Sequence, residues 1–342
     1  MLRSVKFALM LAFPLSLGCT EAERGTEGAA CPSDNNCLLP LRCVSGICSK
    51  VAEAPDTGLL EDSGVGPLDA AELAPDAGEI PSPRFNSGTF STTTDGTGLG
   101  FTISGRAALI VEPTGYTSVM ITASGLTPNT QHGAHVHAKA CADEGGGPHY
   151  KLDPAREDQA EANELWPAIT TDAAGSGRGL VRVMHGARPD AKSVVIHAPG
   201  VATRIACADL LPNVEVQSGG SFSELPDGVG LGFSGTAQLL RRGTGTEVNV
   251  SLSGPLEAGK TYATHVHASP CATESGGPHY KIDPGVMAAE EGNELWPNVT
   301  MTGPNAGMGT KTTTHIARFE AQSVVVHHPD TAKRLLCADL VW

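Results

Sequence analysis

The chain has 342 residues and a formal net charge of −14 at pH 7. This length exceeds one domain of about 150 residues and predicts about two domains. The acidic balance argues against the nucleic-acid backbone as a main partner, because binding to it requires a basic footprint. With 41 glycines and 24 prolines against 8 phenylalanines, 4 tyrosines and 3 tryptophans, the composition predicts short strands joined by turns.

The first 19 residues are typical of an export signal. Arg3 and Lys6 precede an apolar stretch, residues 7–17, that is too short to span a membrane. It ends in Leu-Ser-Leu-Gly-Cys, which resembles the lipobox of bacterial lipoproteins, with Cys19 as the acylated residue. We expect an exported outer-membrane lipoprotein, in the periplasm or at the cell surface, that contacts the membrane only through this lipid. Secretion without a lipid is the alternative.

A cysteine-rich stub and a linker follow the signal. Four cysteines crowd into residues 20–50, a segment too small to bury a core, so two disulfides are favoured over a four-cysteine zinc site. These cysteines are Cys31, Cys37, Cys43 and Cys48, and their pairing is left open. Residues 51–85 are rich in Pro, Ala, Gly, Asp and Glu, which predicts a disordered acidic linker.

The rest of the chain is an internal repeat. Residues 134–154 recur at 264–284, an offset of 130 that three later segments share. We therefore expect two domains, 86–212 and 213–342. Short runs predict strands at 105–111, 118–123, 135–137, 179–184 and 193–197, and a helical turn is expected at 154–163. The pattern predicts an all-β fold of two tandem antiparallel sandwiches or barrels.

Each repeat carries four histidines. His135 and His137 are two residues apart, so in a strand both rings lie on one face; His149 follows a Gly-Gly-Pro turn, and His197 ends an apolar run. The second repeat has His265, His267, His279 and His327 at the matching positions. A lone histidine is usually an ordinary hydrogen-bonded residue, but four in each repeat predict a metal site. Imidazoles without a thiolate suit copper or zinc, and copper binds more tightly when both compete.

The series His-Val-His, Cys, Gly-Pro-His, Val-Val-x-His and Arg-x-x-Cys resembles the copper/zinc superoxide dismutases, in each repeat separately. The resemblance implies tandem Greek-key β-sandwich domains that convert superoxide to O2 and hydrogen peroxide at one copper per domain. It implies that the eight histidines are copper ligands and that His149 and His279 exchange protons during the reaction. It also implies that Arg204 and Arg334 attract superoxide, and that the disulfides are Cys141–Cys207 and Cys271–Cys337.

The departures from that family are informative. No histidine lies between His149 and Glu164, or between His279 and Glu294, where the family has zinc ligands. The link from His197 to Arg204 is also short. These absences resemble the copper-only superoxide dismutases, so zinc is not expected. By that resemblance Glu164 and Glu294 support the rings of His149 and His279, and an exposed loop carboxylate is the alternative.

Two further histidines correspond between the repeats. His185 and His315 each lie twelve residues before the last copper histidine, and we expect buried, hydrogen-bonded side chains, with an accessory metal contact as the alternative. His132 and His328 have no counterpart and receive no role. A copper buffer without turnover and a structural module with vestigial sites are the alternative functions. Packing of the two domains as an internal pseudo-dimer is a further expectation.

Overall fold

The computed structural model describes residues 42–44, 47–49, 82–156, 161–212, 214–286 and 288–342. Of the cysteine-rich stub it describes β1 (Arg42–Val44) and β2 (Ile47–Ser49), which pair as antiparallel strands. The export signal with Cys19, the linker up to residue 81 and the pairing of the stub cysteines lie outside the described residues. In the part that is described, no helix is long and apolar enough to cross a membrane.

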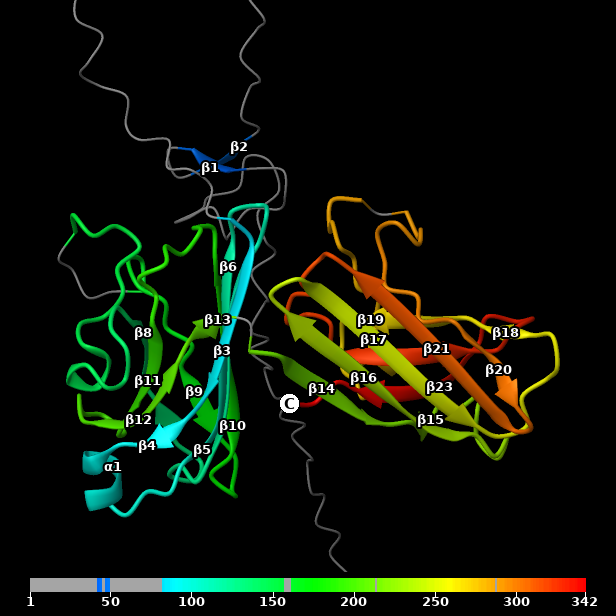
Figure 1. The fold of residues 1–342 in the computed structure, drawn as a ribbon, viewed down its shortest axis with the longest axis horizontal. Coiled ribbons are helices and arrows are strands. Elements are labelled where there is room, and N and C mark those ends of the chain that lie inside the picture. The colour runs from blue at the N-terminus through cyan, green and yellow to red at the C-terminus, as the bar shows by residue number, and fades with distance from the viewer. Residues whose placement is uncertain (1–41, 45–46, 50–81, 157–160, 213, 287) are drawn as a thin grey trace, which may run out of the picture. The chain divides into compact units, whose positions relative to one another are not determined.

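The first repeat forms two antiparallel sheets, as the all-β prediction requires (Figure 1). The larger sheet has the order β13-β3-β5-β6-β10-β9-β7, formed by β13 (Leu211–Pro212), β3 (Arg84–Thr89), β5 (Ser104–Val111), β6 (Thr117–Ser124), β10 (Gly177–Val183), β9 (Ile169–Thr171) and β7 (Gln131–His132). The smaller sheet has the order β4-β12-β11-β8, formed by β4 (Ser91–Thr92), β12 (Arg204–Asp209), β11 (Ser193–His197) and β8 (Ala134–His137). Helix α1 (Thr94–Gly98) and the 3-10 turn η2 (Glu144–Gly146) lie in its connections.

The second repeat forms its own pair of sheets. The larger has the order β14-β16-β17-β21-β20-β18, formed by β14 (Val216–Ser221), β16 (Ser234–Arg242), β17 (Gly245–Ser253), β21 (Ala306–Thr313), β20 (Val299–Gly303) and β18 (Thr261–Tyr262). The smaller has the order β15-β23-β22-β19, formed by β15 (Ser223–Glu224), β23 (Arg334–Asp339), β22 (Ser323–His327) and β19 (Thr264–His267), and the turn η3 (Glu274–Gly276) follows β19. In both repeats, strands far apart in sequence are neighbours, as in Greek-key folds.

The core of each repeat lies between its two sheets. In the first, Leu109 of β5 and Ile121 of β6 belong to the same buried cluster as Val136, Val194 and Ile196 of the smaller sheet. The second repeat has a corresponding cluster. Successive side chains of a strand point to opposite faces, so the residues between these core positions lie on the far face of the smaller sheet.

The expected strands agree with the structure to within two residues, but the helical turn at 154–163 was wrong where it is described. Residues 154–155 and 161–163 form turns, and 157–160 lie outside the described residues. The side chain of Asn163 accepts a hydrogen bond from the backbone N–H of Asp153 and donates to the carbonyls of Asp153 and Arg156. These bonds replace the ones that a helix would make there.

Candidate metal centre

Strand alternation places the histidines of the first repeat on one face of its smaller sheet. In β8, Ala134 and Val136 are in the core, which leaves His135 and His137 on the opposite face. Val195 of β11 pairs with His135, so His197, two residues later, shares that face. A backbone bridge from His137 to His149 brings the fourth ring alongside.

The four rings in each repeat converge tightly enough to hold a metal ion. One nitrogen from each of His135, His137, His149 and His197 lies within 4.8 Å of the others, and so do nitrogens of His265, His267, His279 and His327. Three converging atoms of the first repeat, His135 Nδ1, His137 Nε2 and His197 Nε2, are buried without a hydrogen-bond partner among the described residues. Buried polar atoms are normally paired, and a metal would satisfy all three.

In two rings of each repeat, one nitrogen donates a hydrogen bond to a carbonyl, and the other nitrogen is thereby left free to bind a metal. Nδ1 of His137 lies 3.0 Å from the carbonyl of Gly147, and Nδ1 of His197 lies 2.9 Å from that of Ala202. A carbonyl only accepts, so each Nδ1 carries the proton and each Nε2 keeps a lone pair for a metal. In the second repeat, His267 and His327 donate in the same way to Gly277 and Ala332.

Burial keeps these imidazoles neutral. It lowers the pKa of His135 from 6.5 to about 4 and that of His137 to about 3, and repulsion from His149 and His197 adds to the effect. The pKa values of His265 and His267 fall to about 3 for the same reasons. Neutral imidazole is the form that binds metals, so the sites are ready for an ion near neutral pH.

The fourth ring is held by a buried carboxylate. Nδ1 of His149 donates to Glu164 Oε2 over 2.7 Å, and Nδ1 of His279 donates to Glu294 Oε2 over 2.6 Å. The side chain of Glu164 is 0% exposed and that of Glu294 is 1% exposed. The structure therefore places these acids against the expected rings and not in the exposed loop position that was the alternative.

Two residues of this network were missed by sequence reasoning. Lys151 Nζ donates to the other oxygen of Glu164 over 2.5 Å, and Trp166 Nε1 donates to Oε2 over 2.7 Å. The Trp166 ring also lies 4.9 Å from that of His135. A signal was present, because Lys151 follows His149 by two residues and Trp166 follows Glu164 by two.

The same network occurs in the second repeat. Lys281 and Trp296 donate to Glu294, and the Trp296 ring lies 5.1 Å from that of His265. Burial raises the pKa of the Glu164 carboxyl, but hydrogen bonds from Lys151, Trp166 and His149 outweigh it and leave the pKa below its ordinary value. The pKa of the Glu294 carboxyl is also below its ordinary value, because hydrogen bonds from Lys281, Trp296 and His279 outweigh the effect of burial. Both acids are therefore ionised and accept from every neighbour.

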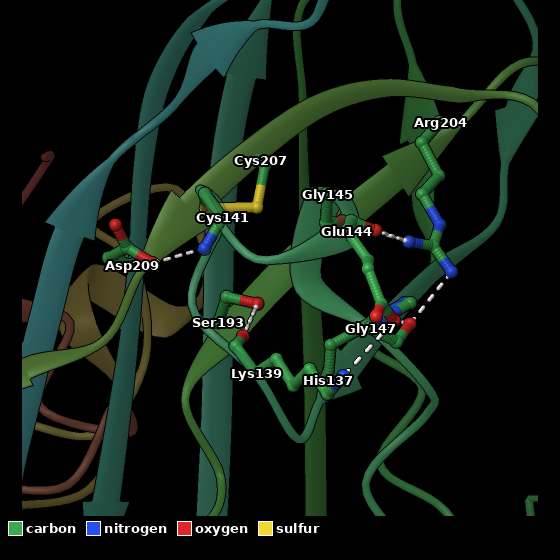
Figure 2. The surroundings of a disulfide bond; sticks show 10 residues. All are labelled: His137, Lys139, Cys141, Glu144, Gly145, Gly147, Ser193, Arg204, Cys207 and Asp209. Atoms are coloured by element: carbon green, nitrogen blue, oxygen red, sulfur yellow. Dashed lines mark hydrogen bonds and ion pairs between the residues drawn. A yellow bond between two sulfur atoms is a disulfide. The ribbon is translucent and has the colours of Figure 1, made fainter.

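The expected arginine is tied to the same loop as His137. Arg204 donates through Nη1 to the carbonyls of Glu144 and Gly145, and through Nη2 to that of Gly147 over 2.7 Å. Because the Gly147 carbonyl also accepts from His137, one peptide group connects the arginine to a metal-site ring, as Figure 2 shows. Arg334 makes the matching bonds to Glu274, Ser275 and Gly277.

A disulfide fastens that loop to the sheet. Cys141 bonds to Cys207 of β12 (Figure 2). In the second repeat Cys271 bonds to Cys337 of β23, and both pairs are those implied by the resemblance. The backbone N–H of Cys141 also donates to Asp209 over 2.7 Å. Gly146 has φ +103°, and a Cβ there would lie 3.0 Å from Ser193 and Val195, so the tight turn requires glycine. The two disulfides indicate an oxidising, non-cytoplasmic location.

The remaining histidines lie outside both groups. Nε2 of His315 shares a hydrogen bond of 2.7 Å with the Tyr280 hydroxyl, in line with the expected hydrogen-bonded role. For His185 that expectation was wrong at one atom, because its Nε2 is buried without a partner among the described residues. His132 is fully buried, and its Nδ1 lies 3.0 Å from the carbonyl of His197, so it supports the backbone of a metal-site residue.

Comparison with known proteins leaves the family open. No protein-family model matches the chain, and no curated protein matches it. Among solved structures, one titled as the clock protein EA4 is 19% identical, with a TM-score of 0.29, and the match covers 37% of this chain and 94% of that one. With so low a score the match carries no argument. The fold and the site define an all-β protein with two histidine groups, each able to hold a metal ion.

Replacing the buried acid is expected to weaken metal binding. Glu164→Gln removes the charge that Lys151 and His149 share, and losing such a partner of a metal ligand costs about 10- to 100-fold in affinity. Titration with Cu(II) against a competing chelator, followed by quenching of the tryptophans beside each site, measures the change. Glu215→Gln, which breaks an exposed ion pair with Arg242, is the control. Equal affinities in the two variants would contradict the role of Glu164.

The stability of the metal-free protein is expected to fall as the pH drops from 6.5 towards 4. The pKa values of His137 and His267 are about 3 when folded and ordinarily 6.5, so in this range the unfolded chain binds more protons and is favoured. Denaturant unfolding over this range gives the slope. In the His137→Gln/His267→Gln variant the slope should be shallower, and an unchanged slope would show that these rings do not carry the effect.

Proposed function

We propose that the protein is a copper-dependent superoxide dismutase with one copper in each repeat. The observation that carries the proposal is the convergence of four imidazoles in each repeat, with one nitrogen of each ring within 4.8 Å of the others, and an arginine in the same pocket of the first repeat. Histidine nitrogens without thiolates suit copper, and bound copper supplies one-electron chemistry by alternating between Cu(II) and Cu(I). The motif series of the sequence supports the same family, with the copper-only members as the nearest pattern.

The surroundings of His149 favour copper without zinc. In the zinc-containing family this ring bridges two metals through both nitrogens. Here its Nδ1 carries a proton that it donates to Glu164, whose other carboxylate oxygen accepts from Lys151, so Nδ1 keeps no lone pair for a second cation. The same holds for His279, Glu294 and Lys281. We therefore propose one metal per repeat and no zinc.

The protein's own groups supply anion attraction and proton handling. Arg204 and His149 line one open pocket, so the guanidinium charge lies on the approach to the rings. The bond to Glu164 orients His149, and in our proposal this ring exchanges protons during turnover. The chain as a whole is acidic, so local positive charge is what draws an anion inward.

The cellular setting is part of the proposal. The export signal, Cys19 lipidation and a periplasmic or surface location fit the oxidising environment that the disulfides indicate. Superoxide is the proposed partner in this setting, and neither nucleic acid nor a membrane contact beyond the lipid is proposed. Packing of the two repeats as an internal pseudo-dimer stays a prediction.

The direct test is the superoxide dismutation rate of the protein loaded with copper in zinc-free buffer. We expect two coppers per chain and a fast rate that is lost on copper removal. Full occupancy with negligible turnover would contradict the proposal and favour a copper buffer. Failure to hold copper would favour a structural module with vestigial sites.

Reversing the arginine charge is expected to slow turnover far more than it weakens copper binding. The variant Arg204→Glu/Arg334→Glu should lower the dismutation rate by about 10- to 1000-fold, the range of electrostatic focusing. The control Arg106→Glu/Arg242→Glu changes the net charge equally at exposed or partly exposed positions. If both variants slow the reaction alike, the effect comes from net charge, and the role of Arg204 and Arg334 is wrong.

A further inference from the structure

The pocket at the first histidine group is much larger than superoxide requires. It has a volume of about 630 Å3 and is open to the surface. A diatomic anion is about the size of a water molecule, whose share of liquid volume is about 30 Å3. Pockets of about 300–1,000 Å3 are typical of small organic ligands. The pocket can therefore hold a molecule much larger than superoxide, the proposed substrate.

Its lining combines an apolar wall with one cation that is not paired with a carboxylate among the described residues. The apolar part consists of Pro148, Trp166, Ala198, Val201 and Ala202. Lys151 also lines the pocket, but its charge is paired with Glu164. Arg204 lines it too, and its guanidinium donates to backbone carbonyls with no carboxylate within ion-pair distance among the described residues. An uncompensated guanidinium in the same pocket as an indole ring suits an aromatic ring that carries a carboxylate.

The second repeat keeps the four histidines but differs from the first in the short loop at the edge of the pocket, which we call the lip. We define the first lip as residues 198–203 and the second lip as residues 328–333. Ala198, Gly200 and Val201 of the first lip correspond to His328, Asp330 and Thr331 of the second.

Polar contacts occupy the second lip. Asp330 forms an ion pair with Lys260 at 2.5 Å, and its backbone N–H donates to His328. Lys333 forms an ion pair with Asp227 at 2.7 Å. The first lip is uncharged, and Thr130 stands where the second repeat has Lys260.

The backbones of the two lips also differ. The left-handed residue of the first lip is Gly200, with φ +70°, whereas that of the second is Ala332, with φ +56°. Val201 is 57% exposed at the edge of the first pocket. The two repeats have therefore kept one histidine arrangement and diverged in the surface through which a ligand must approach it.

We propose that the open pocket beside the first histidine group, which we call the first mouth, binds a small aromatic carboxylate. The corresponding surface beside the second histidine group, the second mouth, does not bind it. The ring lies against the apolar wall that includes Trp166 and Val201, and the carboxylate pairs with Arg204. At the second mouth, His328, Asp330 and Thr331 replace Ala198, Gly200 and Val201, so the edge is polar and offers an aromatic ring less apolar contact. This binding needs no metal and goes beyond the proposed dismutation.

The test is a fluorine NMR titration of the metal-free full chain with para-fluorobenzoate. We expect one site per chain, and para-fluorobenzyl alcohol, which lacks the charge, should bind about tenfold more weakly or not at all. Val201→Glu, at an exposed position, should weaken binding by about tenfold or more through repulsion. Its matched control is Thr331→Glu on the second lip, which should have no effect.

A loop exchange tests the lip as a whole. Replacing residues 198–203 by the sequence of 328–333, together with Thr130→Lys, should abolish binding, and the reverse exchange in the second repeat should create a second site. Cu(II) loading of each variant shows that the histidine groups remain folded. Absence of binding to the unaltered chain, or equal effects of Val201→Glu and Thr331→Glu, would overturn the proposal. The titration and the dismutation assay are independent, so either proposal can fail while the other stands.

Discussion

The buried carboxylate of Glu164 fixes the side chains that surround the first histidine group. An ionised acid without solvent contact is costly unless donors satisfy it, and here an imidazole, an ammonium and an indole do so. Each donor is thereby held in one orientation. The ring of His149 presents Nε2 to the other histidines, and the Trp166 ring stays beside His135. Glu294 does the same in the second repeat.

The position of the Arg204 guanidinium depends on the backbone. Arg204 is held by carbonyls of the loop that follows β8, and a disulfide ties that loop to the strand that carries the arginine. The Gly147 carbonyl serves both Arg204 and His137. The position of the guanidinium relative to the rings is therefore set by a closed path of covalent and hydrogen bonds. Carbonyl partners leave its positive charge uncompensated, whereas a carboxylate would cancel it.

Much of the site could be predicted because its residues recur at one offset and alternate in strands. His135 and His137 lie on one face by the period of a strand, and Val136 between them is in the core. The same rule applies to His149 and Lys151, with Tyr150 buried between them, but the function of the lysine was not read from it. His185 differs from the expectation at one atom, because its counterpart His315 meets a tyrosine hydroxyl whereas Nε2 of His185 has no partner among the described residues.

The sequence by itself determined the all-β class, the two copies, the eight metal-site histidines and the positions of the arginines, because these follow from periodicity, spacing and a repeated motif series. The tertiary structure decided which loop lies beside which strand. Only there do Glu164 and Lys151 meet, thirteen residues apart, and Arg204 reach the carbonyl of Gly147. The tertiary structure also decided the shapes of the two lips. Contacts of this kind arise from how the sheets pack and where the turns place the loops, and no local pattern encodes them.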